Sequence, residues 1–221
     1  MPICRAMPDT PPQLSVLRRH ERFVAIDKPS GLLSVPGRAP EHHDSVHTRA
    51  RALFPDATGP LIMHRLDWET SGVLLLALDP EAHAHLGRQF ERRTIAKTYI
   101  AVLSGVPDQP AGRISLPIKP DYSNRPYQIV DHDNGRESIT DYRVLDTANG
   151  HARVEFTPLT GRTHQLRVHA AKGLNLPILG DALYGDRTSA PRLLLHAAAI
   201  ECTEPVKGSR TRIRIESPVP F

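Results

Sequence analysis

The stretch that decides the fold runs Leu61-Ile62-Met63-His64-Arg65-Leu66-Asp67-Trp68-Glu69-Thr70-Ser71-Gly72-Val73-Leu74-Leu75-Leu76-Ala77-Leu78. Its two ends, residues 61–63 and 73–78, are continuous apolar runs, which are typical of strands buried on both faces of a sheet. The polar segment between them, residues 64–71, is then an edge loop of the kind that often carries catalytic groups. Asp67 is its candidate functional group, although spacing alone favours a surface ion pair or a turn cap.

Helix starts can be recognised on either side of this stretch. Asp79-Pro80-Glu81 combines a capping carboxylate with proline at the first helical position, and it predicts a helix to about Arg93. Asp44 can cap an earlier helix, in which Val46, Ala50 and Leu53 follow the helical period. Thr163 can cap a third helix over residues 164–172, which Gly173 would end.

Strands make up most of the remaining pattern. Besides the two central runs, they are expected at residues 23–26, 97–103, 112–118, 138–146, 151–157, 193–201 and 211–216. Residues 138–157 should form a hairpin about Ala148-Asn149-Gly150. Because strands outnumber helices and hairpins are frequent, we expect an α+β fold with a large mixed, mainly antiparallel sheet flanked by helices.

Length and composition favour one globular domain. The chain has 221 residues, of which 39% are hydrophobic and 24% charged, and it has neither a membrane-length apolar run nor a secretory signal. We expect a flexible, proline-rich tail over residues 1–13 and a single domain over residues 14–221. The two cysteines, Cys4 and Cys202, exclude a disulfide framework or a cysteine metal cluster and fit a cytoplasmic protein.

The charge balance is mildly basic. Lysine and arginine total 28 against 24 acidic residues, and the pI is about 9.3. Arginine outnumbers lysine 23 to 5, which suits bidentate contacts to phosphate. A G+C-rich genome would give the same bias together with the 21 prolines, so composition alone indicates a nucleic-acid partner only weakly.

His64-Arg65-Leu66-Asp67-x-x-Thr70-Ser71-Gly72 resembles the signature of the RluA family of pseudouridine synthases. Further blocks are similar to this family in the same order, and together they cover residues 21–217. They are Asp27-Lys28-Pro29-Ser30-Gly31, Arg88-Gln89-Phe90 through Lys97-Thr98-Tyr99, Gly161-Arg162-Thr163-His164-Gln165-Leu166-Arg167-Val168-His169, Pro177-Ile178-Leu179-Gly180-Asp181 with Tyr184-Gly185, and Leu193-Leu194-Leu195-His196-Ala197.

The resemblance implies a fold, a reaction and three catalytic residues. It implies the pseudouridine synthase fold without an S4 domain, and isomerisation of uridine to pseudouridine in RNA without any cofactor. Asp67 would be the nucleophile, attacking C1′ of the ribose or C6 of the uracil. Arg167 would pair with Asp67 and keep it ionised. Tyr99 would stack on the target base and is a candidate for removing the C5 proton, unless it is an ordinary core aromatic.

The same resemblance implies how RNA is held. The target base would be flipped out of its stack, with Arg65 filling the vacated space and Leu166 and Leu195 as apolar pocket walls, or plain core residues. Cations would contact the phosphates: Arg88, Arg92, Arg93, Lys97, Arg125 and Arg162. The implied substrates are a loop uridine of 23S ribosomal RNA and one in the anticodon stem-loop of certain tRNAs, bound by a monomer.

Three alternatives are weighed against this hypothesis. An RNA-binding or RNA-chaperone protein could use the same fold with little catalysis, but Asp67 beside Arg65, Tyr99 and Arg167 favours an enzyme. A hydrolase would need a nucleophile motif such as Gly-x-Ser-x-Gly, which is absent. A metal site is not expected, because His164 and His169 do not share one helical face. We expect His64, His164, His169 and His196 to be structural residues with satisfied ring nitrogens.

Overall fold

The computed structural model describes residues 14–221, so the predicted tail over residues 1–13, including Cys4, lies outside the described residues. Ten strands form one sheet: β1 (Ser15–Arg19), β2 (Phe23–Lys28), β3 (Leu61–Ile62), β4 (Ser71–Ala77), β5 (Ala96–Leu103), β6 (Ala111–Ser115), β9 (Ile139–Ala148), β10 (His151–Pro158), β11 (Leu195–Thr203) and β12 (Arg212–Glu216). A second, two-stranded sheet contains β7 (Ile118–Pro120) and β8 (Gln128–Val130). The helical elements are α1 (Val46–Leu53), α2 (Pro80–Glu91), α3 (Gln165–Val168), the 3-10 turns η1 (Pro40–His42) and η3 (Arg187–Ser189), and the π-helical η2 (His169–Gly173).

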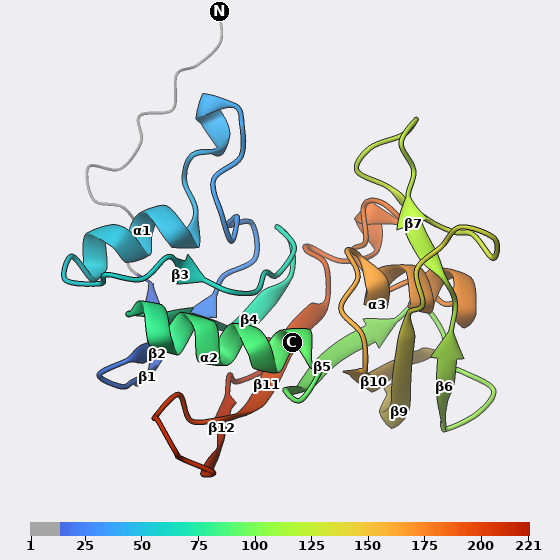
Figure 1. Ribbon diagram of the computed structural model, residues 1–221. Coiled ribbons are helices and arrows are strands. Elements are labelled where there is room, and N and C mark those ends of the chain that lie inside the picture. The colour runs from blue at the N-terminus through green and yellow to red at the C-terminus, as the bar shows by residue number, and fades with distance from the viewer. Residues whose placement is uncertain (1–13) are drawn as a thin grey trace, which may run out of the picture.

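The large sheet follows the order β1-β2-β4-β11-β5-β10-β9-β6, with β12 added on β11 and β3 on β4 (Figure 1). Its pairings are antiparallel except between β4 and β11, which are parallel and joined only through Ser71–His196 and Gly72–Ala197. The predicted α+β class with a mixed, mainly antiparallel sheet is confirmed. Among residues 14–221, no helix is long and apolar enough to cross a membrane.

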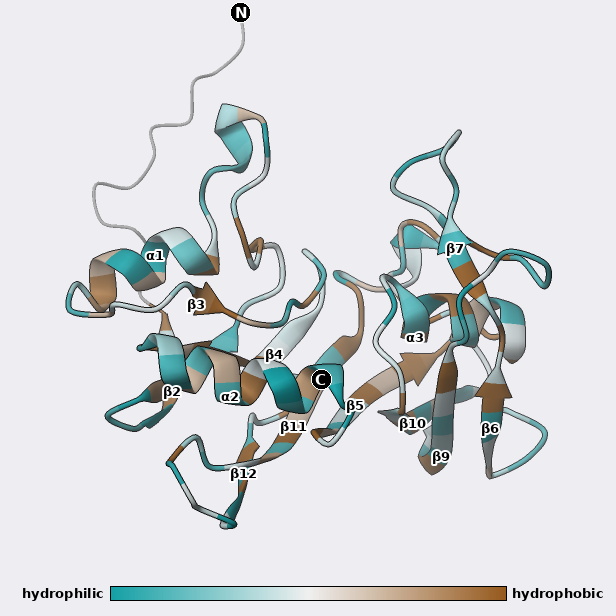
Figure 2. Ribbon diagram, viewed as in Figure 1, coloured by the Kyte–Doolittle hydropathy of each residue, from teal (hydrophilic) through white to brown (hydrophobic). Residues whose placement is uncertain are grey.

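The β2–β4 half of the sheet is covered on both faces. Alternate residues of a strand point to opposite faces, and Val24 and Leu74 accordingly pack with Val46 of α1, whereas Ala25 and Leu75 pack with Leu86 of α2. This explains why β4 has no polar face: all seven of its residues are buried. Figure 2 shows the corresponding hydrophobic colouring on the strands and the hydrophilic residues on the loops.

The β5–β10 half has its own core against α3 and η2. Ala101, Val154 and Phe156 pack there with Leu166 and Ala170. Tyr99 of β5 packs against this cluster and also against the α1 cluster. It therefore lies at the seam between the two halves of the sheet.

Two of the predicted helix caps are wrong. Asp79 caps α2 by accepting from the amide of Ala82 at 2.9 Å, as expected. The cap of α1, however, is Ser45, which accepts from the amide of Thr48 at 3.1 Å, while Asp44 forms an ion pair with Arg49. The residue before α3 is His164, not Thr163, and no side chain caps that helix.

The predicted hairpin about Asn149-Gly150 is confirmed. Both residues have positive φ, 52° and 77°, as the favoured two-residue hairpin turn requires. They connect β9 to β10 directly, and the strands pair from Ala148–His151 to Thr140–Pro158. Four elements were not predicted: the edge strand β1, the short β8 and the 3-10 turns η1 and η3.

Gly72 is the glycine on which the central junction depends, since it faces Lys28 of β2 and Ala197 of β11. Its φ is +114°, and a Cβ there would lie 2.3 Å from the Ala197 carbonyl oxygen. We expect Gly72→Ala to lower the free energy of unfolding by about 3 kcal/mol or more, because the strain and the backbone clash add.

Denaturant unfolding would measure this, with Gly87→Ala as the matched control. Gly87 lies in α2 with nothing within 4 Å of an added Cβ, so alanine there should stabilise the protein by about 0.5–1 kcal/mol. Equal effects of the two substitutions would contradict the role given to Gly72.

Candidate active site

The loop between β3 and β4 is attached by hydrogen bonds to the end of β2 and to the segment that follows it. Lys28 has no exposed surface, and its Nζ donates to the carbonyls of Pro29, Leu32 and Trp68. Desolvation by burial lowers the pKa of Lys28 to about 7. These bonds attach the loop to the end of β2.

Two serines complete this attachment. Ser30 donates to the carbonyl of Glu69 at 2.7 Å. Ser34 both donates to the Leu66 carbonyl and accepts from the Leu66 amide, at 2.7 and 3.0 Å. The backbone is therefore fixed immediately before and after Asp67, which is the precision that a reacting group requires.

Asp67 lines a cavity of about 1010 Å³ at the seam of the sheet. Nine of the twelve residues proposed from the sequence line this cavity: Arg65, Asp67, Arg93, Lys97, Tyr99, Arg162, Leu166, Arg167 and Leu195. The other three are exposed and lie outside it, Arg88 and Arg92 at α2 and Arg125 in the β7–β8 loop. The structure thus brings together side chains from the β3–β4 loop, β5, α3 and β11.

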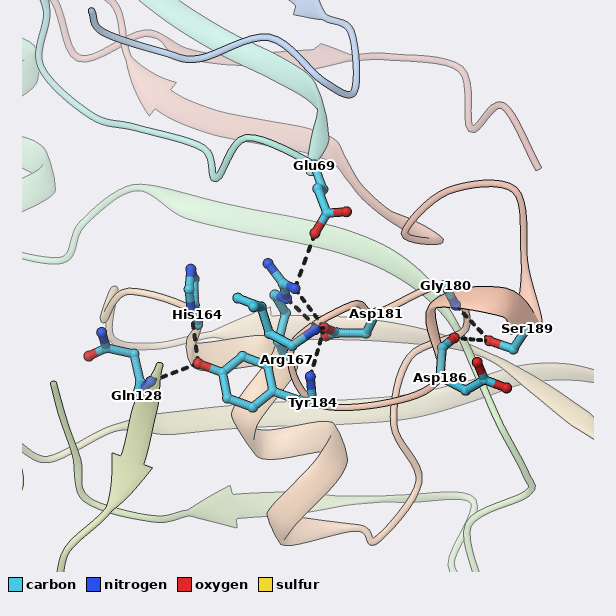
Figure 3. Close-up of polar contacts among 10 residues, drawn as sticks. Glu69, Gln128, His164, Arg167, Gly180, Asp181, Tyr184, Asp186 and Ser189 are labelled. Carbon is cyan, nitrogen blue, oxygen red and sulfur yellow. Dashed lines mark hydrogen bonds and ion pairs between the residues drawn. The ribbon is translucent and has the colours of Figure 1, made fainter. Parts of the chain in front are cut away.

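Arg167 is held differently from the expectation. Its guanidinium donates twice to Asp181, at 2.8 and 2.6 Å, and once to Glu69, at 3.2 Å (Figure 3). The expected ion pair with Asp67 is therefore wrong: Arg167 acts on Asp67 only as a nearby charge. The reason is that Asp181 is fully buried, and a buried carboxylate needs a bonded cation more than a half-exposed one does.

The surroundings of Arg167 keep it charged. Burial alone lowers the pKa of Arg167, but the hydrogen bonds and charge of Asp181 outweigh burial and, with Asp67 and Glu69, raise it. The ring of Tyr184 lies 5.5 Å from the guanidinium carbon, at cation–π distance. Arg167 is thus a permanent positive charge beside the cavity.

Tyr99 occupies the central strand, paired with Ala197 of β11 and Phe156 of β10. Burial, followed by the charge of Asp67, raises the pKa of the Tyr99 hydroxyl. The phenol therefore stays protonated at neutral pH. An aromatic ring with a neutral hydroxyl, exposed to a cavity beside a carboxylate, is suited to stacking on a flat ligand.

Sequence reasoning missed the partners of the proposed residues. Asp181 and Tyr184 belonged to a recognised block and Glu69 to the signature stretch, but nothing in their spacing indicated a role. Glu69 is 98 residues from Arg167 along the chain. The buried position of Lys28 was also not predicted, because lysine is almost never fully buried unless it is paired.

Of the histidines expected to be structural with satisfied ring nitrogens, His196 is as expected, whereas the expectation is wrong for His169, whose buried Nε2 has no hydrogen-bond partner in the described part of the chain. Nε2 of His64 accepts from the Leu75 amide at 2.9 Å, and its ring stacks on Phe90. Both ring nitrogens of His196 are bonded, to Ser71 and Ser217. Within residues 14–221, no three His, Cys, Asp or Glu side chains are grouped so that they could hold a metal ion.

Residues 22–172 match the family model for RNA pseudouridylate synthase. The chain therefore belongs to the RNA pseudouridylate synthase family, and it is an isomerase of uridine in RNA. Among solved structures, the fold resembles that of human RNA pseudouridylate synthase domain containing 1 (TM-score 0.77, 28% identity, 98% of this chain and 87% of that one) and domain containing 4 (TM-score 0.74, 29%, 93% and 88%).

Curated relatives from bacteria are more similar in sequence. The dual-specificity RNA pseudouridine synthase RluA of Escherichia coli strain CFT073 is 45% identical over 206 residues, covering 91% of this chain and 92% of the relative. The protein of that name in Salmonella typhi is 42% identical over 212 residues, with 94% and 95% covered. The one in Yersinia pestis is 44% identical over 206 residues, with 91% and 98% covered.

The two carboxylates on Arg167 should differ sharply in their effect on stability. Asp181→Asn leaves a buried guanidinium without its main partner, so we expect the free energy of unfolding to fall by about 3 kcal/mol or more. Glu69→Gln removes one longer contact at a more exposed side chain, for which about 1 kcal/mol is expected. Urea denaturation of the two isosteric variants tests this, and an equal or larger loss for Glu69→Gln would contradict it.

The buried histidines predict a loss of stability in acid. Burial lowers the pKa of His64 to about 3 and of His169 to about 4, against about 6.5 in the unfolded chain. Below pH 6.5 these histidines therefore bind protons in the unfolded state but not in the folded state, so the free energy of unfolding falls as the pH falls. Above pH 6.5 the two histidines contribute a constant amount to the free energy of unfolding. From pH 7 to pH 5 we expect a fall of about 3–4 kcal/mol in the free energy of unfolding.

This fall can be measured by urea denaturation at the two pH values. Each histidine contributes a slope of about 1.4 kcal/mol per pH unit. His169→Gln removes one of the two histidines, so it should reduce the change in the free energy of unfolding between pH 7 and pH 5 by roughly half. An unchanged free energy of unfolding between pH 7 and pH 5 would show that these rings are not excluded from protonation.

Proposed function

We propose that this enzyme isomerises uridines in both ribosomal and transfer RNA, with Asp67 as its nucleophile. The observation that supports the assignment is that Asp67, Tyr99 and Arg167 line one cavity although they come from three distant segments. Its volume is at the upper end of the range for small-ligand sites, so a whole nucleotide fits. Support for the two substrates comes from the relatives named dual-specificity RNA pseudouridine synthase.

Two roles in the reaction, the nucleophile and the group that stacks on the base, have candidate residues. The carboxylate of Asp67 attacks the nucleoside at C1′ or C6, the N1–C1′ bond breaks, and the uracil turns and rejoins C1′ through C5. The C5 proton is then released and N1 is protonated. Tyr99 stacks on the base, and its raised pKa favours this role over that of the proton acceptor.

Binding of the flipped nucleotide uses the cavity walls. Leu166 and Leu195 are both cavity-lining and core residues, with 6% and 2% of their surface exposed. Arg65 lines the cavity and is exposed, so its planar guanidinium can stack in the space that the base leaves. Unstacking costs a few kcal/mol, which these contacts offset.

The phosphate contacts are proposed to form two groups. Arg93, Lys97 and Arg162 line the cavity, where burial lowers the pKa of Lys97 to about 8. The exposed Arg88, Arg92 and Arg125 would contact RNA farther from the target. Affinity should fall with rising salt through both groups. We further propose that the enzyme acts as a monomer in the cytoplasm, where both classes of RNA are found.

Asp67→Asn should reduce the reaction rate at least about 1000-fold, as removal of a nucleophile does in other enzymes. The measurement is tritium release from RNA labelled at uracil C5, with transcripts of 23S ribosomal RNA and of tRNA as separate substrates. Asp56→Asn, an exposed carboxylate outside the cavity, is the control and should leave the rate unchanged.

The outcomes separate the two parts of the proposal. Full activity of Asp67→Asn would refute the nucleophile assignment. If the wild-type enzyme released tritium from only one of the two RNA classes, the dual specificity would be refuted. Release from neither would refute the substrate proposal as a whole.

A further inference from the structure

His164 differs from the expectation that the histidines are structural with satisfied ring nitrogens. It is half-buried and lines the cavity that contains Asp67. Its backbone lies in the left-handed region, with φ 54° and ψ 17°, which few residues other than glycine adopt and which is concentrated at functional sites. The turn before α3 therefore places this ring at the cavity at some cost in strain.

One ring nitrogen of His164 is fixed by a chain of two hydrogen bonds. The backbone amide of Gln128 and Nδ1 of His164 both lie 2.8 Å from the hydroxyl oxygen of Tyr184 (Figure 3). An amide can only donate, so Gln128 occupies a lone pair of that oxygen. Among residues 14–221, Nδ1 of His164 is the only acceptor within hydrogen-bond distance of that hydroxyl, so the hydroxyl proton is paired when it is donated to Nδ1.

This chain favours one tautomer of His164. Burial lowers the pKa of His164, so the ring is neutral at pH 7. A neutral imidazole that accepts at Nδ1 carries its proton on Nε2. Nε2 of His164 has no hydrogen-bond partner among residues 14–221, in contrast to His196, whose two nitrogens are both bonded.

We propose that His164 is a substrate-binding residue that donates a hydrogen bond from Nε2 to an oxygen of the target nucleotide, with Tyr184 and Gln128 as its positioning residues. The acceptor is a uracil carbonyl or an adjacent phosphate oxygen. This proposal rests on the proposed function, because it takes the cavity to be the nucleotide site.

A donor fixed in this way has two physical advantages. It needs no reorientation when the nucleotide enters, so little conformational entropy is lost on binding. It also recognises an acceptor selectively: a carbonyl at the uracil 4-position satisfies it, whereas the amino group of cytosine there is itself a donor. The ring of Tyr184 also lies over Arg167, so one side chain orients two cavity groups.

The test compares His164→Ala, His164→Gln and Tyr184→Phe with the wild type in single-turnover tritium release and in RNA binding by fluorescence anisotropy. We expect His164→Ala to lower kcat/KM and RNA affinity about 10- to 100-fold, and His164→Gln, which can still donate, to recover part of the loss. Tyr184→Phe should show an intermediate loss, because Nδ1 can then take the proton and leave Nε2 an acceptor. His20→Ala, in the turn before β2, is the control and should behave as the wild type.

Modified RNAs identify the acceptor. The penalty of His164→Ala should shrink on RNA with 2-thiouridine or 4-thiouridine at the target if a uracil carbonyl is bound, and on RNA with a methylphosphonate beside the target if a phosphate is bound. An unchanged penalty on all of these RNAs, or wild-type affinity and rate for a folded His164→Ala, would overturn the proposal.

The same experiment separates this proposal from the one on which it rests. Loss of tritium release with the wild-type protein would count against the proposed function, while the binding measurements would still decide the role of His164. Thermal unfolding of each variant checks that the loss does not come from instability.

Discussion

The buried ion pair of Arg167 and Asp181 is the interaction on which the site depends. Both side chains are removed from water, Arg167 at 2% exposure and Asp181 at 0%. Burying two charges is costly, and it is tolerated only with excellent geometry and with the remaining polar atoms bonded. Asp181 meets this condition, since it accepts two bonds from Arg167 and two more from the amides of Leu183 and Tyr184.

This pair organises three segments that share no secondary structure. Arg167 belongs to α3 and Asp181 to the turn after residue 180, and Glu69 adds the β3–β4 loop. Tyr184, placed by the same turn, holds His164 on one side and covers Arg167 on the other. A single buried charge pair thus holds Arg167 and His164 at the cavity, while Lys28 and the two serines hold the backbone on either side of Asp67.

The sequence predicted elements best where the signal is local. Asp79-Pro80 predicted the start of α2, and Asn149-Gly150 predicted the β9–β10 turn, because capping and turn preferences act within a few residues. Distinguishing Asp44 from Ser45 was beyond such rules, since either side chain can cap and tertiary contacts decide which one does.

For the candidate site, the family resemblance supplied nine residues that the structure places around one cavity. What it could not supply were pairings between distant segments, and Arg167 shows why. A guanidinium has five donors, and burial and geometry decide which carboxylates it binds. Neither can be read from the sequence, in which Asp67, Glu69 and Asp181 are chemically alike.

The corrected pairing has a chemical consequence for Asp67. A carboxylate engaged by a bidentate arginine has its oxygens directed at the guanidinium, and it must break those bonds before it can attack another atom. Because Asp181 and Glu69 hold Arg167, the side chain of Asp67 has no hydrogen-bond partner among residues 14–221, while Arg167 still contributes positive charge nearby. The positive charge of Arg167 therefore lies near Asp67 without bonding to it, which leaves the Asp67 oxygens free to contact a ligand in the cavity.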